Sequence, residues 1–60
     1  MAMTYKEFKA IIGDMTYHDY EADNEEYNVR HYERRGCIGT VVYCYKNQVN
    51  HYSITYLEDQ

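Results

Sequence analysis

Histidine and cysteine are the residue types in this chain that could hold a metal ion. The sequence has His18, His31, His51, Cys37 and Cys44. Protein zinc sites draw their ligands from short spacings such as CxxC or HExxH, because those spacings bring donor atoms together on one turn or helix face. None of these spacings occurs in the chain. We therefore predict that the protein binds no metal and no other cofactor.

The two cysteines are predicted to be free thiols. Cys37 and Cys44 are seven residues apart within one expected strand. An odd spacing places them on opposite faces, and a strand of that length spans roughly 23 Å. A disulfide needs Cα atoms within about 7 Å of each other. Free thiols are typical of a reducing compartment, so we expect a cytoplasmic location in a host cell.

The sequence contains no motif that is typical of a catalytic site. The chain has 60 residues, with no nucleophile motif and no glycine-rich phosphate loop. Catalytic acids and bases need an enclosed cleft that perturbs their protonation, and so short a chain is too small to build one. We predict a non-enzymatic protein with no catalytic residues.

The carboxylates are unevenly distributed. Residues 14–26 hold six acids and no Lys or Arg, a formal charge of −6, whereas the rest of the chain is formally +2 and the whole chain is −4. Such a density of carboxylates steers a protein toward a basic surface, and nucleic-acid-binding proteins present basic surfaces to phosphates. Tyrosines interrupt the acids, and tyrosine is a common interface anchor. The predicted partner-binding residues are Asp19, Glu21, Asp23, Glu25, Glu26, Tyr17, Tyr20 and Tyr27.

Three arginines, Arg30, Arg34 and Arg35, form the basic counterpart and lie close in sequence to Tyr32. Arginine beside aromatic rings can stack on single-stranded bases, which makes direct nucleic-acid binding a weaker alternative function. Because the chain is net negative, we instead expect these arginines to pair with the local acids or to hold a carboxylate of a partner.

A helix over residues 4–12 is the clearest local element. Thr4 and Glu7 have the spacing of a capping box, in which each side chain accepts a hydrogen bond from the backbone N–H of the other residue. Met3 and Phe8 occupy the positions of a hydrophobic staple around that cap. Gly13 follows where helices commonly end in a left-handed residue.

The C-terminal part of the chain, residues 27–58, is rich in β-branched and aromatic residues and is predicted to form a β-meander. Turn signals separate its strands, because glycine and asparagine favour tight turns. The expected strands are 27–34, 37–46 and 49–58, with turns at 35–36 and 47–48.

The acidic connecting segment, residues 14–26, is harder to interpret. We expect it to be mostly irregular, with a helical turn, because acidic residues and Asn24 favour turns and loops. A second short helix beginning near Asp19 and an extra edge strand around residues 15–20 are the alternatives.

The expected fold is a single α+β domain over residues 1–60, in which a short N-terminal helix packs on a three-stranded antiparallel β-meander. Strand residues alternate between faces, and both faces of the expected sheet carry apolar side chains, with Ile38 and Val42 on one and Val41 and Tyr43 on the other. One short helix covers only one face. The other face is either an exposed interface or is covered by the acidic segment.

These features predict a small acidic protein that binds another protein as an inhibitor or adaptor and presents carboxylates to a basic, nucleic-acid-binding surface. In size and charge, though in no motif, the chain resembles small acidic proteins of phages and mobile elements that block host defence enzymes such as CRISPR effectors or restriction systems. The alternative is a homo-oligomeric structural or adaptor module that associates through its tyrosine-rich sheet. No apolar run is long enough for a membrane-spanning helix, so we expect no membrane partner.

Overall fold

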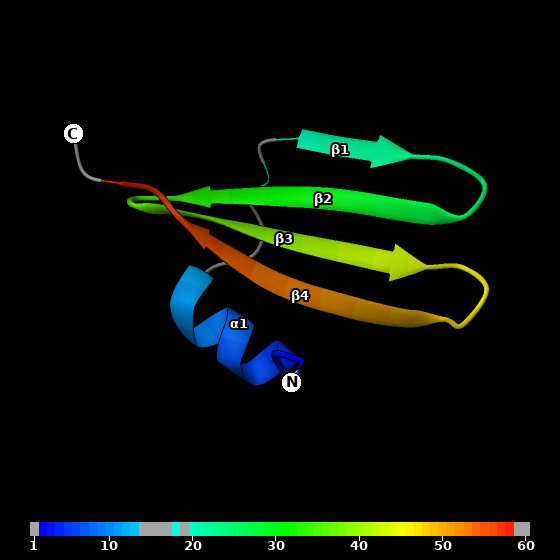
Figure 1. Ribbon diagram of the computed structural model, residues 1–60, viewed down its shortest axis with the longest axis horizontal. Helices are drawn as coiled ribbons and strands as arrows, with labels where there is room; N and C mark the ends of the chain where they lie inside the picture. The colour runs from blue at the N-terminus through cyan, green and yellow to red at the C-terminus, as the bar shows by residue number, and fades with distance from the viewer. Residues whose placement is uncertain (1, 14–17, 19, 59–60) are drawn as a thin grey trace.

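The computed structural model describes residues 2–13, 18 and 20–58, which form one helix and four strands (Figure 1). In chain order these elements are α1 (Tyr5–Ile12), β1 (Tyr20–Asp23), β2 (Tyr27–Arg34), β3 (Cys37–Cys44) and β4 (Val49–Tyr56). The strands pair in the order β1-β2-β3-β4, each antiparallel to the next, and α1 lies against one face of the sheet. The predicted α+β fold is confirmed, but the predicted number of three strands is wrong because β1 adds a fourth.

The additional strand, β1, lies in the acidic segment, for which the sequence predicts mostly irregular structure. A turn centred on Asn24 explains the difference. Asn24 Oδ1 accepts hydrogen bonds from the backbone N–H groups of Glu26 (2.7 Å) and Tyr27 (2.8 Å), and the Asn24 N–H donates to the Tyr27 carbonyl (3.0 Å). Such turns reverse the chain, so β1 folds back along β2. Its acids suit an outer edge, where charge discourages pairing with a further strand.

The helix begins as the sequence predicts. The Glu7 N–H donates to Thr4 Oγ1 (3.1 Å) and the Thr4 N–H donates to Glu7 Oε1 (2.9 Å), which completes the capping box. At the other end Gly13 has a φ of +81°, and its N–H donates to the Lys9 carbonyl (2.7 Å). The Arg34 guanidinium of β2 donates to the Ile12 carbonyl. This arginine therefore satisfies a free carbonyl at the helix end and ties the helix to the sheet.

The core is the contact between α1 and the middle of the sheet. Phe8 and Ile12 are the buried residues of the helix, and Phe8 and Val41 have the largest fully buried side chains described. The Phe8 ring lies edge-on to Tyr32, with centroids 6.3 Å apart, and 5.2 Å from the Tyr52 ring. Cys37 completes the buried cluster, and the partly buried side chains packed around it are Met3, Ile11, Tyr52 and Ile54.

The strand register divides the side chains of the sheet between two sides, because directly opposed residues of antiparallel strands project from the same side. Tyr32 and Val41 share the core with α1 and define the helix side. Cys37 lies on the helix side and Cys44 on the other, and both are free thiols, as predicted. The side away from the helix, which we call the open face, carries Tyr20, Ala22, Tyr27, Val29, His31, Glu33, Ile38, Thr40, Val42, Cys44, Val49, His51, Ser53 and Thr55.

The two tight turns of the predicted meander are also present. Gly36 connects β2 to β3 with a φ of +83°, a conformation that glycine adopts without steric cost. Between β3 and β4, Gln48 has a φ of 58°, and its N–H donates to the Cys44 carbonyl (2.7 Å). Within the described ranges, α1 is too short to cross a membrane, and no other helix is present.

Replacing Gly39 with alanine is expected to destabilise the fold. The added Cβ would lie 2.7 Å from Ile12 Cδ1 and from Phe8 Cζ, closer than carbon atoms pack, so the helix would have to move away from the sheet. Overpacking of this kind costs about 1–3 kcal/mol. The free energy of unfolding, measured by urea denaturation, reports the loss.

A second variant, Ile12→Val, tests the cause because it removes Ile12 Cδ1, one of the three atoms that the new methyl group would meet at 2.7 Å, and so relieves part of the clash. Alone, it should cost about 0.5–1.5 kcal/mol. Combined with Gly39→Ala, it should give a total loss smaller than the sum of the two single losses, since contacting residues do not act independently. Fully additive losses would argue against a close approach of helix and sheet at Gly39.

Candidate protein-interaction surfaces

The first candidate surface is the acidic hairpin, which we define as residues 20–28. Glu21 and Asp23 project to the helix side of β1, and Glu25 and Glu26 occupy the turn. All four side chains are exposed. The hairpin thus gathers four carboxylates that the sequence predicts as partner-binding residues.

Two of these carboxylates are oriented by neutral hydrogen-bond donors. Asn28 Nδ2 donates to Glu21 Oε2 (2.8 Å), and the Tyr45 hydroxyl donates to Asp23 Oδ1 (2.5 Å). The hydrogen bond to Asp23, with smaller contributions from desolvation and from the charges of Asp23 and Glu21, raises the pKa of Tyr45. A neutral phenol is therefore the form that holds Asp23 in place.

The arginines do not neutralise the hairpin. Among the described residues, the carboxylates of the hairpin make no ion pair with Lys or Arg, and Glu21 Oε1 lies 3.7 Å from His18 Nε2. Arg34 is bound to the Ile12 carbonyl. Arg30 lies across from Glu21 in the strand register, but its side chain forms no ion pair there within the same ranges. Pairing of the arginines with local acids, which the sequence favours, is not seen in this part of the chain.

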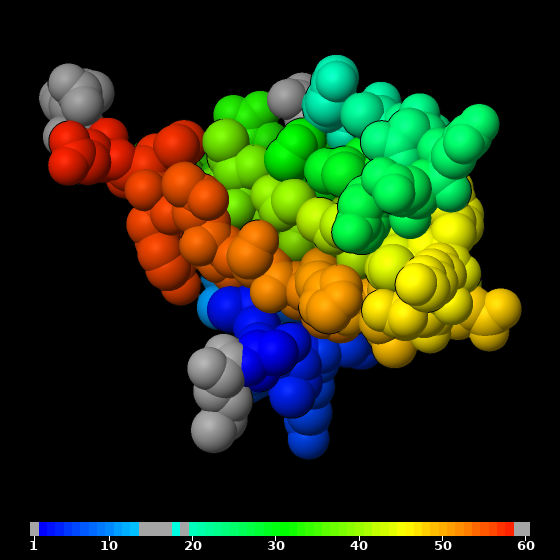
Figure 2. Space-filling model, turned by 45° about the vertical axis from the view of Figure 1, so that its right-hand side comes forward, coloured from blue at the N-terminus to red at the C-terminus, as the bar shows by residue number. Residues whose placement is uncertain are grey.

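The hairpin lies at one end of the sheet, beside the turn between β3 and β4. Figure 2 shows these two segments, green and yellow, together on the right of the molecule. The Tyr45 N–H donates to the Glu26 carbonyl (3.1 Å) and joins the two turns. Tyr45 therefore holds the hairpin twice, through its backbone and through its hydroxyl.

The tyrosines predicted to act with the acids do not share their surface. Tyr20 and Tyr27 project from the open face, whereas Glu21 and Asp23 project to the helix side. The Tyr20 ring stacks on His31, with centroids 5.6 Å apart. A flat partner surface therefore cannot touch both groups at once. Two further predicted site residues, Tyr17 and Asp19, lie outside the described residues.

The open face is the second candidate surface. It mixes apolar and neutral polar side chains: Val29 and Val42 are a cross-strand pair near the centre, next to His31 and Thr40, and Ile38 and Val49 lie toward opposite ends. Glu33 is its one charged residue apart from histidine. Among the described residues no helix or strand packs against this face, since α1 contacts the other side. The acidic segment does not cover it there either, because the described part of that segment extends the sheet as β1.

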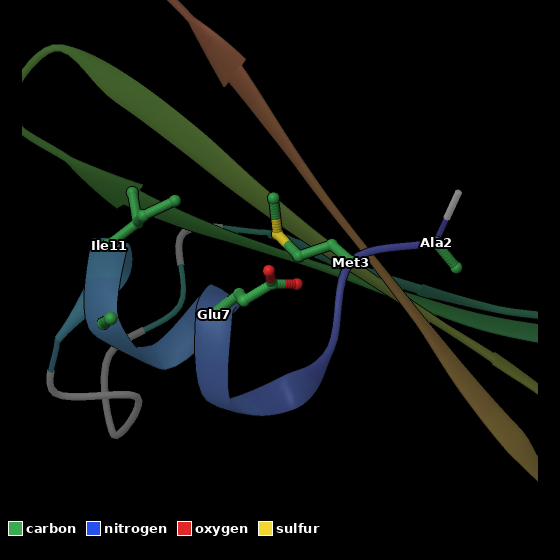
Figure 3. A pocket seen from close by; sticks show the side chains of 5 residues that line it. Ala2, Met3, Glu7 and Ile11 are labelled. Atoms are coloured by element: carbon green, nitrogen blue, oxygen red, sulfur yellow. The ribbon is translucent and has the colours of Figure 1, made fainter.

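A shallow depression beside the helix is a weaker candidate. It is lined by Ala2, Met3, Glu7, Ala10 and Ile11, and Figure 3 shows Met3 of the N-terminal segment beside Glu7 and Ile11 of α1. Its single carboxylate already accepts the Thr4 N–H in the capping box. In the described part of the chain, no group of three His, Cys, Asp or Glu side chains is placed to hold a metal ion.

Comparisons with protein-family models, with curated proteins and with solved structures found no match to this chain. The acidic hairpin and the open face are therefore the two features of the described residues that bear on function. The sequence alone indicated the acids of the first surface. The sequence also indicated the open face, because apolar residues such as Ile38 and Val41 occupy both faces of the strand β3.

Replacing Asp23 with asparagine is expected to lower the pKa of Tyr45 toward the ordinary tyrosine value of about 10. The carboxylate that accepts the phenol proton's hydrogen bond is then lost. Because the folded-state pKa of Tyr45 is raised, the stability from this contact is complete below the unfolded-state pKa and is lost as the pH rises through the folded-state value. NMR titration of the Tyr45 ring resonances measures the shift.

Glu25→Gln is the matched control, because it removes one charge from the same hairpin at a residue with no hydrogen bond to Tyr45 in the structure. The Tyr45 pKa should change little in this variant. If both substitutions lowered the Tyr45 pKa equally, the shift would come from the negative charge of the whole hairpin. The hydrogen bond to Asp23 would then not be its cause.

Proposed function

We propose that this protein is a non-catalytic inhibitor or adaptor that binds another protein through the acidic hairpin, and that the partner presents a basic, nucleic-acid-binding surface. The observation that carries the proposal is the set of four exposed carboxylates of the hairpin, which make no ion pair with Lys or Arg within the described ranges. Their charge is therefore available to a partner.

The way the carboxylates are held supports the proposal. Asn28 and Tyr45 orient Glu21 and Asp23 by donating hydrogen bonds while carrying no positive charge. Orientation before contact reduces the side-chain entropy that binding must remove. The uncompensated charge also accelerates encounter with a basic partner, because complementary potentials steer diffusion.

A nucleic-acid-binding groove is the basic surface that this arrangement suits. Such grooves bind phosphates through Lys and Arg, and carboxylates held on a projecting hairpin can contact the same side chains. The chain's small size and its net charge of −4 extend the proposal to a phage or mobile-element inhibitor of a host defence enzyme, acting in the host cytoplasm.

The test compares two variants that each remove two adjacent charges. Glu25→Gln with Glu26→Gln alters the turn of the hairpin, and Glu58→Gln with Asp59→Asn alters the C-terminal end of the chain; both change the net charge from −4 to −2. Tagged proteins are used to capture a partner from host lysate. The partner should be retained by the wild type and by the C-terminal variant and lost by the hairpin variant.

Competition with duplex DNA of random sequence completes the experiment. Excess DNA should release the captured partner at low salt if carboxylates occupy its phosphate-binding groove, because DNA binds such a groove most tightly at low salt. Equal capture by both variants would remove the hairpin as the contact. If capture needs the hairpin but excess DNA does not release the partner, the hairpin does bind a protein. The partner surface is then not a nucleic-acid-binding groove.

A further inference from the structure

We propose that the open face is the interface of a homodimer, in which two copies of this chain pack their sheets face to face around a two-fold axis. This inference goes beyond the proposed function, since it uses the side of the sheet opposite to the acidic carboxylates Glu21 and Asp23. The occupant is a second copy for three reasons: the charge of the face, the position of the connecting segment and the state of the sheet edges.

The charge of the face suits an identical partner. Each chain has a net charge of −4, so two copies repel each other wherever their acids meet. The strand register turns Glu21 and Asp23 to the helix side and leaves Glu33, near one end of β2, as the carboxylate of the open face. Copies that meet through this face therefore bring apolar and neutral groups together and keep most of their carboxylates apart.

The connecting segment between α1 and β1 is described at His18, and there it lies on the helix side. The His18 ring is 5.9 Å from the ring of Tyr32, which belongs to the core, and His18 Nε2 is 3.7 Å from Glu21 Oε1. Both neighbours project away from the open face. At this point, then, the chain's own acidic segment is not the group that covers Val29 and Val42.

The edges of the sheet are less suited to self-association. On β4, which has no Lys, Arg, Asp or Glu, Met3 forms an antiparallel bridge with Tyr52 at the middle of the outer edge. On β1, Glu21 and Asp23 place two acids on a strand of only four residues. The Met3 bridge interrupts the β4 edge at its middle, and the acids of the short β1 strand disfavour strand addition there, so neither edge offers a second copy an uninterrupted strand.

The area of the face is enough for a dimer of moderate affinity. A strand of eight residues is about 27 Å long and neighbouring strands are about 4.8 Å apart, so this sheet presents on the order of 450 Å² in projection. Side-chain relief raises the area buried by two copies to about 1,000 Å², the lower limit for a specific interface. We expect dissociation in the micromolar range, because interfaces at this lower limit of area are typical of weak, transient complexes.

The experiment measures molecular mass by sedimentation equilibrium between about 1 and 200 μM, a range that brackets the expected dissociation constant. The wild type should shift from monomer to dimer. Val42→Lys places a charge at the centre of the face and should weaken the dimer at least a hundredfold, because a buried unpaired charge is strongly unfavourable. Tyr56→Lys, on the helix side and 68% exposed, is the matched control and should leave the dimer unchanged.

A second variant, His51→Lys, separates loss of the dimer from unfolding of the monomer, which Val42→Lys could also cause. His51 is exposed and lies opposite Val42 on the open face, so His51→Lys should leave the monomer fold intact, as judged by circular dichroism, and still weaken the dimer. Isotope-filtered NMR of mixed labelled and unlabelled chains should show contacts between the Val29 and Val42 methyl groups of different copies.

Three results would overturn the proposal. A wild type that stays monomeric up to 200 μM, the upper end of the range chosen from the expected affinity, would exclude it. So would a dimer that persists in both Val42→Lys and His51→Lys, since it would have to use another surface such as the β4 edge. Contacts of the Val42 methyl groups with residues 14–17 of the same chain would show that the connecting segment covers the face.

Discussion

The close approach of α1 to the backbone of Gly39 is the constraint on which the rest of this structure depends. Phe8 and Ile12 rest where a side chain on Gly39 would be, and Tyr32 and Val41 flank them in the core. A single helix of eight residues supplies one layer of core on one side of the sheet. The helix packs on the side of the sheet that carries Gly39. The residues of each strand that project from the open face therefore lie outside this core.

The strand register then determines which side of the sheet the acids of the hairpin project from. A shift of one residue in β1 would exchange its two faces, turning Glu21 and Asp23 onto the open face and Tyr20 toward the helix side. The Asn24 turn and the hydrogen bonds from Asn28 and Tyr45 hold the observed register. The acids are thus placed by contacts within and beside the hairpin, and the side on which they project is set relative to the core.

The sequence predicts those parts of the fold that local chemistry determines. The capping box of Thr4 and Glu7, the positive φ at Gly13 and Gly36, and the opposite facing of the two cysteines each follow from neighbouring residues, and the structure confirms them. The strand β1 could not be predicted in this way, because its acidic composition is typical of a loop and its stability comes from pairing with β2.

The candidate site was predictable only in part for a related reason. Acids and tyrosines that alternate in sequence look like one mixed patch as long as the segment is taken to be irregular. Once residues 20–23 are a strand, alternation must send Tyr20 and Glu21 to opposite sides. The contact of Arg34 with Ile12 joins residues 22 positions apart in the sequence, a pairing that no local pattern reveals.

The strand register, which places Glu21 and Asp23 on the helix side and Val29 and Val42 on the open face, makes the two proposed interactions compatible. If the protein self-associated through its carboxylates, the like charges of the two copies would repel each other. The carboxylates would also be hidden from another partner. Here the sheet separates the two, so a dimer formed through Val29 and Val42 would leave Glu21 and Asp23 of both hairpins available. A partner with two basic sites within reach would then bind two linked hairpins, and linkage converts the second contact into an intramolecular one. Weak individual contacts, which are what a few exposed carboxylates provide, become effective through that linkage.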